Sequence, residues 1–371
     1  MAPTIPGAEA LASLAAALFP GGAVARIEPL GPDAGGGDKA IGYGRPQRVT
    51  VRLPGGGERR FVFRTQAPNE FGHDRRADRA EGALLAYDLF GRFPRHVRAL
   101  DVGAIAADGR LVSLGGAGEF WLATDWADGT LYADDLRRVA AQGAGPLDRA
   151  RADALVDYLV RLHAERIDDP VAWRRAVRDL LGHGEGIFGL VDAYPPDVPA
   201  APPARLRALE ERCLAARWAL RARAGRLART HGDFHPFNVV FRPPGPGEDG
   251  AGFTLLDASR GGAGDPADDV VALTVNYPFF ALGHPGAWAG GLRELWRRAW
   301  ERYLAGTGDR AVLETAPAYL AWRALVLACP RFYPHLPAPA RDRLLGLAER
   351  TLDAGRLEPG EADALFAAEG A

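Results

Sequence analysis

The chain has 371 residues, of which 47% are hydrophobic and 25% are charged, as in ordinary globular proteins. This length is too great for one small core and predicts one large domain or two coupled ones. The formal net charge of -2 argues against binding to nucleic acid or to an anionic membrane, because either would need a dominant positive field.

Cysteine content and hydropathy indicate the cellular compartment of the protein. Cys213 and Cys329 lie far apart and form no CxxC motif, so neither a disulfide framework nor a cysteine zinc site is expected. A reducing, cytoplasmic compartment fits best. No run approaches the ~20 apolar residues of a membrane-spanning helix. The apolar segment 9–19 has no basic region before it and repeats its leucines at helical spacing, which predicts a helix and not a secretion signal.

The first part of the chain carries strand patterns separated by glycine-rich turns. Residues 23–31, 48–53 and 60–65 are candidate strands, and the last two are joined by the turn PGGGERR. The glycine-rich segment DAGGGDKAIGYG lies between the first two strands. Strand, glycine-rich loop, strand, tight turn, strand predicts an antiparallel meander.

A helical pattern at residues 74–93 follows the meander, and segments 99–116 and 118–129 predict further strands. Helical patterns then dominate, interrupted by a hairpin whose strands are 239–241 and 253–259. We expect a small β-rich lobe with one main helix at residues 1–125 and a larger, mostly helical lobe at residues 126–371.

The stretch RTHGDFHPFNVVF places four polar residues directly before the first strand of that hairpin: His231, Asp233, His235 and Asn238. The returning strand of the hairpin ends at Asp257. A metal site, a hydrolytic site and a phosphoryl-transfer loop could each use these groups.

The spacing of the oxygen-bearing residues favours phosphoryl transfer. Transfer from ATP needs a carboxylate that positions the attacking hydroxyl and accepts its proton, and hard oxygen ligands for Mg²⁺. An Asp, an Asn five residues later and an Asp on the adjacent strand supply these parts. A zinc site built on the two histidines lacks further ligands at matching spacing. A serine hydrolase would need a GxSxG elbow, which the sequence does not contain.

HGDFHPFN followed by LLDASRGGAGDPADDVVAL resembles the aminoglycoside phosphotransferase and choline kinase family, whose pattern is HGDxxxxN, a metal-binding Asp and GDPxxDLA. The resemblance implies an α+β, bilobal, protein-kinase-like fold. It also implies ATP- and Mg²⁺-dependent transfer of the γ-phosphate to a hydroxyl of a small molecule, with an aminoglycoside-, choline- or sugar-like acceptor.

The same resemblance implies roles for the motif residues. Asp233 is the expected catalytic base, and Asn238 and Asp257 are the expected magnesium ligands. His231 is expected to support the loop. Asp269 matches the last Asp of GDPxxDLA and is expected to brace the catalytic loop from the head of a helix.

A kinase-like small lobe should carry a cation on its third strand for the ATP phosphates and a carboxylate on the following helix that orients this cation. The matching residues are Arg64, where the family more often has lysine, and Glu81. Lys39 in the glycine-rich loop is an alternative source of the positive charge.

Two backbone regions complete the expected nucleotide site. The glycines at the loop, Gly35, Gly36 and Gly37, would let backbone amides approach the phosphates. Asp125 and Trp126 lie at the elbow between the lobes, where adenine is expected to pair with the backbone.

Three residues are candidates for contact with the acceptor. Arg260 is expected either to meet the transferred phosphate or the substrate, or to pair with a nearby carboxylate (Asp265, Asp268 or Asp269). Glu185, in the segment GHGEG, is expected either to contact a polyol or amine acceptor or to belong to a glycine-rich helix terminus. His235 lies where an acceptor or phosphate would pass and has no assigned task.

The expected partner is a small-molecule hydroxyl substrate, with no nucleic acid and no membrane; the sequence does not predict the oligomeric state. The main alternative is a nucleotide-binding regulator or pseudokinase of the same fold. The complete set of Asp233, Asn238 and Asp257 speaks against it, while arginine at position 64 leaves it open. A protein kinase is less favoured, because no APE-like end of an activation segment follows Asp257.

Overall fold

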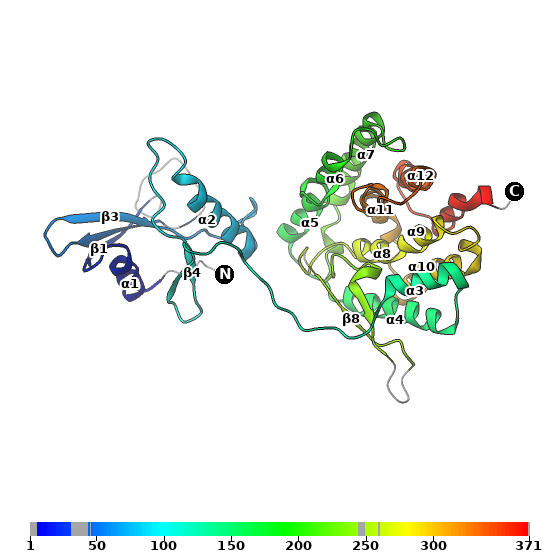
Figure 1. The fold of residues 1–371 in the computed structure, drawn as a ribbon, viewed down its shortest axis with the longest axis horizontal. Helices are drawn as coiled ribbons and strands as arrows, with labels where there is room; N and C mark the ends of the chain where they lie inside the picture. The colour runs from blue at the N-terminus through cyan, green and yellow to red at the C-terminus, as the bar shows by residue number, and fades with distance from the viewer. Residues whose placement is uncertain (1–5, 31–43, 45, 244–248, 259, 370–371) are drawn as a thin grey trace. The chain divides into compact units, whose positions relative to one another are not determined.

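The structure is a computed structural model that describes residues 6–30, 44, 46–243, 249–258 and 260–369. The chain divides into two compact units, Met1–Thr124 and Asp125–Ala371, whose elements are labelled in Figure 1. This division lies one residue from the expected boundary, and the function assigned to each unit stays a prediction. A small antiparallel sheet in the first unit and many helices in the second confirm the predicted α+β fold class.

The first unit contains an antiparallel three-stranded sheet in the order β1-β2-β3, a short hairpin of two strands and two helices. Its elements are α1 (Ala8–Leu18), β1 (Ala23–Pro29), β2 (Gln47–Arg52), β3 (Glu58–Phe63), α2 (Arg76–Phe90), β4 (Gly103–Ile105) and β5 (Leu111–Ser113).

The core of the first unit forms between α1 and the sheet. Val49 and Val51 of β2 and Phe61 of β3 are buried together with Leu11 and Ala15 of α1. Leu11 and Ala15 are four residues apart and therefore lie on one face of the helix. The apolar stripe of α1 thus covers one face of the sheet.

The predicted strand at residues 118–129 is absent from the structure; in this part of the chain only β6 (Thr130–Leu131) is a strand. It pairs with β7 (Val239–Phe241) of the motif hairpin. An apolar alternation is not sufficient for a strand, because each strand also needs a neighbour for its backbone groups.

The second unit is mostly helical. After β6 its elements are α3 (Tyr132–Gln142), α4 (Pro146–His163), α5 (Pro170–Gly182), α6 (Ile187–Ala193), α7 (Pro203–Arg221), η2 (Ala224–Arg226), η3 (Pro236–Asn238), β7, β8 (Phe253–Leu255), α8 (Pro266–Thr274), α9 (Asn276–Leu282), η4 (Trp288–Leu292), α10 (Arg293–Thr307), α11 (Val312–Ala328), α12 (Ala338–Ala354) and η5 (Pro359–Glu369).

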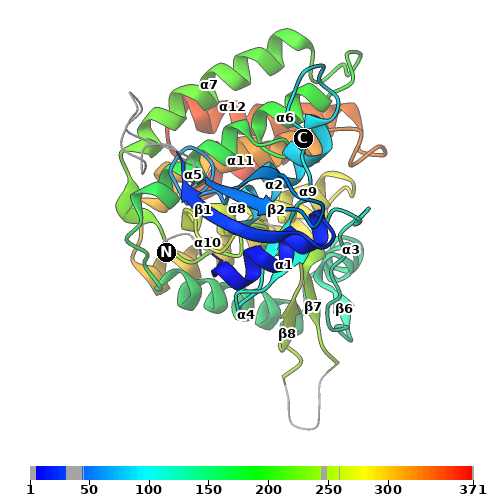
Figure 2. The same ribbon diagram turned by 90° about the vertical axis from the view of Figure 1, so that its left-hand side faces the viewer.

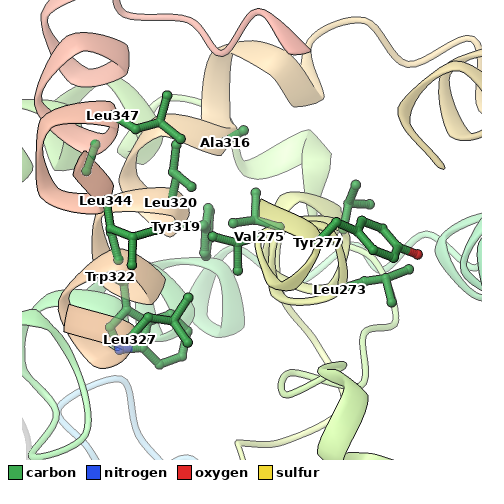
Figure 3. Close-up of a cluster of buried hydrophobic side chains, with 14 of the residues drawn as sticks. Leu273, Val275, Tyr277, Ala316, Tyr319, Leu320, Trp322, Leu327, Leu344 and Leu347 are labelled. Atoms are coloured by element: carbon green, nitrogen blue, oxygen red, sulfur yellow. The ribbon is translucent and has the colours of Figure 1, made fainter. Parts of the chain in front are cut away.

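Helix α11 lies at the centre of this unit. Most of its residues are buried, in contact with α8 on one side and α12 on another. Figure 3 shows Leu320 of α11 beside Leu344 and Leu347 of α12, and the side chains of Val275 and Tyr277 farther along the same cluster. A helix that is apolar on nearly every face must be surrounded by other elements, so any charged residue in α11 needs partners.

The motif hairpin is held by its neighbours in the sheet β6-β7-β8, which is visible in Figure 2. Val239 pairs with Leu255 and Phe241 pairs with Phe253. Residues 239–241 are all buried, so the loop before β7 and the residues after β8 rest on a rigid support. Among the described residues, none of the helices combines the length and the apolar character that a membrane crossing requires.

Candidate active site

The HGD loop has a backbone that only glycine suits at its centre. Gly232 has φ +80°, and a Cβ there would lie 3.3 Å from the Cβ of Arg260. The backbone N–H groups of His231 and Gly232 donate to the two carboxylate oxygens of Asp269 at 2.7 and 2.8 Å. The Nδ1 atom of His231 accepts from the backbone N–H of Asp233 at 3.3 Å, so the imidazole also lies within the loop.

Asp269 lies in the first turn of α8 and is completely buried. Besides the two loop N–H groups, its Oδ2 lies 3.2 Å from Nε2 of His163, whose Nδ1 lies 2.8 Å from the hydroxyl of Tyr303. The buried carboxylate therefore has partners for both oxygens. These contacts support the brace that the sequence suggested for Asp269, and that role stays a proposal.

The Asp233 carboxylate has different surroundings at its two oxygens. Its Oδ1 accepts from Nη1 of Arg323 at 2.7 Å and from Nη2 of Arg260 at 2.8 Å. Its Oδ2 has only long contacts, 3.4 Å to Nε2 of His235 and 3.4 Å to Nδ2 of Asn238. One oxygen is thus tightly bound within the protein, and the other is more loosely held.

The balance of burial and charge keeps this carboxylate ionised. Burial alone would raise the pKa of Asp233, but the hydrogen bond from His235 and the charges of Arg323 and Arg260 outweigh it. The pKa of Asp233 is consequently held well below its usual range. An ionised carboxylate is the form that can orient a hydroxyl and accept its proton.

Asn238 links the loop to the returning strand. Its side-chain Nδ2 donates to the backbone oxygen of Asp233 at 3.1 Å, and its own backbone oxygen accepts from the N–H of Leu256 at 2.9 Å. The next residue, Asp257, has φ +46°, a conformation that costs a non-glycine residue about 1–3 kcal/mol and is concentrated at functional sites. Asp257 is exposed, and its carboxylate has no hydrogen-bond or ion-pair partner in the described part of the chain.

Asn238 and Asp257 together offer oxygen donors of the kind that Mg²⁺ prefers. Magnesium is usually held by one or two carboxylates together with substrate phosphates and waters. No group of three or more His, Cys, Asp or Glu side chains in the described residues could hold a metal ion by itself. The donor set therefore fits a metal ion that is shared with a phosphate ligand.

Arg323 was not among the predicted site residues. It lies on α11, is 7% exposed, and joins Oδ1 of Asp233 to Oδ1 of Asp268 at 2.7 and 3.1 Å. The sequence does contain one signal for it, because a single arginine in the otherwise apolar segment 318–328 must find partners if that helix is buried. The identity of those partners is not readable from the segment.

Arg260 also donates to the carboxylate of Asp233. The carboxylates that were considered as its alternative partners are bound by other groups. Asp265 receives two hydrogen bonds of 3.0 Å from Arg226, and Asp268 pairs with Arg323. The Nη2 atom of Arg260 additionally donates to the backbone oxygen of Gly232. The structure thus places Arg260 at the candidate base, and a contact with substrate or phosphate stays a prediction.

The guanidinium groups of Arg323 and Arg260 both lie over the ring of Trp322. The guanidinium carbons of Arg323 and Arg260 lie 4.1 and 4.2 Å from the centre of its ring, within the range of a cation–π interaction. The indole N–H donates to the backbone oxygen of Glu185 at 2.8 Å. The GHGEG segment therefore reaches this site through the backbone of Glu185, while the Glu185 side chain is exposed.

His235 begins the η3 turn with its ring close to the candidate base. Its Nδ1 accepts from the backbone N–H of Phe237 at 3.2 Å, so Nε2 is the atom that faces Oδ2 of Asp233. The His235 side chain is 26% exposed, and a contact with an acceptor stays a prediction.

In the first unit, the predicted cation lies next to the expected strand and the predicted carboxylate lies on the expected helix, but the structure does not bring the two side chains together. Arg64 directly follows β3, and its guanidinium carbon lies 5.5 Å from the ring centre of Phe90. Glu81 lies exposed on α2. No ion pair joins Arg64 and Glu81 among the described residues of this unit. Their roles stay predictions.

The remaining nucleotide-site predictions concern loop residues. Gly35, Gly36, Gly37 and Lys39 lie outside the described residues. Asp125 and Trp126 lie in the extended segment before β6, where the indole N–H of Trp126 donates to Asp128 at 2.9 Å. Adenine recognition by this segment stays a prediction.

The loop presents an ionised carboxylate beside two further oxygen donors, an arrangement that is compatible with the phosphotransferase class of protein. A family model described as the phosphotransferase enzyme family matches residues 41–313. The chain belongs to this family, and the family relationship predicted from HGDFHPFN and GDPADD is confirmed.

Solved structures of small-molecule kinases are similar to this chain. A glucosamine kinase shares 19% identity at a TM-score of 0.42, with 95% of this chain and 100% of that chain covered. The aminoglycoside phosphotransferase APH(3'')-Id from Streptomyces rimosus shares 18% identity at a TM-score of 0.36, with 75% and 89% covered. A choline/ethanolamine kinase family protein from Mesorhizobium loti shares 16% identity at a TM-score of 0.35, with 92% of each chain covered. No curated protein sequence matches the chain.

Proposed function

We propose that this phosphotransferase is an ATP- and Mg²⁺-dependent kinase that transfers the γ-phosphate to a hydroxyl of a small molecule. One observation carries the proposal. Asn238 is joined both to Asp233 and, through its backbone, to the residue before Asp257, so the three oxygen-bearing residues form one constellation on a buried hairpin. Membership in the phosphotransferase family supports the reaction type.

In the proposed reaction Asp233 orients the acceptor hydroxyl and takes its proton. Asn238 and Asp257 hold Mg²⁺, which when bound supplies charge neutralisation between the phosphates. His231 and Asp269 keep the loop in shape through the hydrogen bonds to its backbone. Asp257 has a positive φ and is exposed, so its carboxylate is open to a metal ion.

The nucleotide-binding role falls to the first unit and to the segment that joins the units. Arg64, or Lys39 in its place, supplies a positive charge to the phosphates, and Glu81 orients it. The glycine-rich loop with Gly35, Gly36 and Gly37 covers the phosphates. Asp125 and Trp126 offer their backbone to adenine.

The charges around Asp233 favour an uncharged, sugar-like acceptor over a polycationic aminoglycoside or a choline-like amine. Two guanidinium groups already neutralise Asp233 and Asp268, so these two carboxylates have little negative charge left to attract a cationic acceptor.

Both described cysteines, Cys213 and Cys329, are buried as free thiols. A reducing compartment preserves free thiols, and we therefore place the protein in the cytoplasm. The resident partners of the proposed enzyme are then ATP, Mg²⁺ and a small hydroxyl compound.

The Asp233→Asn variant tests the proposal. A coupled ADP-release assay with sugars, amino-acid alcohols, choline-like amines and aminoglycosides should show a loss of about 10²–10⁴-fold, the usual contribution of a general base. Asp353→Asn is the matched control, because Asp353 is an exposed partner of Arg212 and its variant should keep wild-type turnover. Unchanged ATP-dependent transfer in Asp233→Asn would refute the role of the base.

The pseudokinase alternative makes a different prediction for the metal ligand. A regulator that only binds nucleotide would show slow ATP hydrolysis that survives Asp257→Ala, and no acceptor would accelerate it. The intact set of Asp233, Asn238 and Asp257 favours the kinase.

A further inference from the structure

Arg323 bridges three parts of the second unit next to the candidate base. Its Nη1 donates to Oδ1 of Asp233 at 2.7 Å. Its Nη2 donates to Asp268 on α8 at 3.1 Å and to the backbone oxygen of Gly232 at 3.5 Å. One buried guanidinium from α11 therefore fixes both the HGD loop and the first turn of α8.

A second guanidinium reaches the same carboxylate oxygen from another direction. Arg260 donates to Oδ1 of Asp233 at 2.8 Å, and both guanidinium groups lie on the ring of Trp322. We call Arg323, Arg260 and Trp322 the arginine clamp. Charge-assisted hydrogen bonds of this length are about twice as strong as neutral ones, so Oδ1 is the anchored oxygen.

Anchoring matters because a free carboxylate rotates. The terminal torsion of an aspartate is broad and nearly two-fold, so its two oxygens exchange places unless one of them is held. A misplacement of about 1 Å can cost a reaction roughly 10²-fold. With Oδ1 held by two arginines, Oδ2 keeps a fixed position and has only the two 3.4 Å contacts with His235 and Asn238.

From this asymmetry we propose that Arg323 and Arg260 are positioning residues that hold Oδ1 of Asp233 and present Oδ2 to the acceptor hydroxyl. In the step itself, the acceptor oxygen bonds to the γ-phosphorus while the bond to the β-phosphate oxygen breaks and ADP leaves. The hydroxyl proton passes to Oδ2. The inference rests on the proposed function, but the clamp is a contact within the protein and is measurable without turnover.

The first measurement is a double-mutant cycle in thermal unfolding with Arg323→Met, Asp233→Asn and the double variant. Removing one member of a buried ion pair leaves the other charge uncompensated, so the two losses in Tm should be non-additive. Arg323→Met should cost less in the Asp233→Asn background than in the wild type. Additive losses would overturn the clamp, whether or not the protein is active.

The second measurement separates positioning from simple structural support. Arg323→Met should lower kcat by at least about tenfold with KM for ATP within about twofold of the wild type, because the nucleotide contacts are elsewhere. Arg323→Lys should retain part of the rate, and added guanidinium ion should restore part of kcat in Arg323→Ala. Wild-type kcat in Arg323→Met would overturn the proposal.

The matched control is Arg341→Met. Arg341 on α12 is also buried, but it donates to the backbone oxygens of Ala328 and Tyr333 at 2.6 Å. This variant should lower Tm and leave kcat of the folded protein within about twofold. If Arg323→Met does not fold, Arg260→Met replaces it, because that side chain is 21% exposed; its kcat should fall in the same way.

The two measurements distinguish the clamp from the proposed function. If the wild type transfers phosphate to no acceptor and the Tm losses are non-additive, the proposed function fails and the clamp stands. If the wild type is an active kinase and the Tm losses are additive, the clamp fails and the proposed function stands.

Discussion

Two neighbouring carboxyl groups, Asp233 and Asp268, share the guanidinium of Arg323 but differ in the direction of their pKa. Burial raises the pKa of Asp268 to about 6 against the lowering effect of Arg323 and Arg260, and the charge of Asp269 adds to the increase. Burial and the charges of Asp265 and Asp268 raise the pKa of the nearby Tyr319. Asp268 therefore gains a proton near pH 6, while Asp233 stays ionised.

We expect the acid limb of kcat/KM to report Asp268 and not the base. As the pH falls through about 6, protonation of Asp268 removes the charge that holds Arg323, and the rate should fall. Asp268→Asn imitates the protonated group, so its rate should be reduced at high pH and flat between about pH 5 and 8. Rate profiles of both proteins at saturating ATP and Mg²⁺ measure this, and an unchanged acid limb in the variant would contradict it.

The exposed carboxylate of Asp257 predicts the metal dependence. Asp257→Asn should raise the Mg²⁺ concentration for half-maximal rate by at least about tenfold, a loss of about 1.4 kcal/mol. Asparagine tolerates positive φ, so the backbone should be kept and only the charge is lost. Titration of EDTA-treated protein with Mg²⁺ measures the shift. An equal Mg²⁺ requirement in both proteins would remove Asp257 from the metal site.

At the scale of elements, the sequence Gly264-Asp265-Pro266 forms the N-terminus of α8 next to the site. Asp265 accepts from the backbone N–H of Ala267 at 3.0 Å, which caps the helix. The same buried carboxylate accepts from Nε and Nη2 of Arg226 and from the hydroxyl of Thr315 on α11. This anchors the helix that carries Asp269 and Asp268 to the rest of the unit.

Loss of this anchor should cost stability. Asp265→Ala removes one partner of a buried ion pair and should lower the free energy of unfolding by about 3–5 kcal/mol. The exposed pair of Arg212 and Asp353 offers the comparison, since Asp353→Asn should cost less than about 1 kcal/mol. Chemical denaturation of both variants measures the difference, and similar losses would show that the Asp265 pair is not an anchor.

Elements were predictable where the pattern and the partner lie close together in the chain. The hairpin of β7 and β8 follows from two apolar runs that are joined by the Pro- and Gly-rich segment 242–252. The helix that contains Arg323 follows from its apolar composition. The strand expected at residues 118–129 is wrong because its alternation says nothing about a neighbouring strand. Arg64 and Glu81 lie near the predicted elements, yet no ion pair joins them among the described residues, because such a pair depends on packing that no local pattern specifies.

At the scale of the whole molecule, the net charge of -2 conceals a concentration of arginine around the candidate base. Arg260 and Arg323 contact Asp233 directly. Neutralised carboxylates do not attract cations, and the acceptor hydroxyl has to approach within hydrogen-bonding distance of Asp233.

Acceptor charge is therefore the next prediction. A neutral sugar should have a higher kcat/KM than a polycationic aminoglycoside, and acetylation of an amino sugar should raise kcat/KM for the same ring. The measurement is ADP release with glucosamine and N-acetylglucosamine at low ionic strength, where charge effects are largest. A clear preference for the free amine would contradict the neutral-acceptor proposal.

The sequence by itself determined the family, the fold class and a phosphoryl-transfer interpretation, because these depend on short-range relations. Gly232 needs its positive φ within the loop, and Asn238 reaches Asp233 across five residues. Only the tertiary structure decided what surrounds the base. Arg323 meets Asp233 across 90 residues of sequence, and this contact depends on which face of a buried helix packs against the loop. Local composition predicts that such an arginine needs a partner, but only packing selects it.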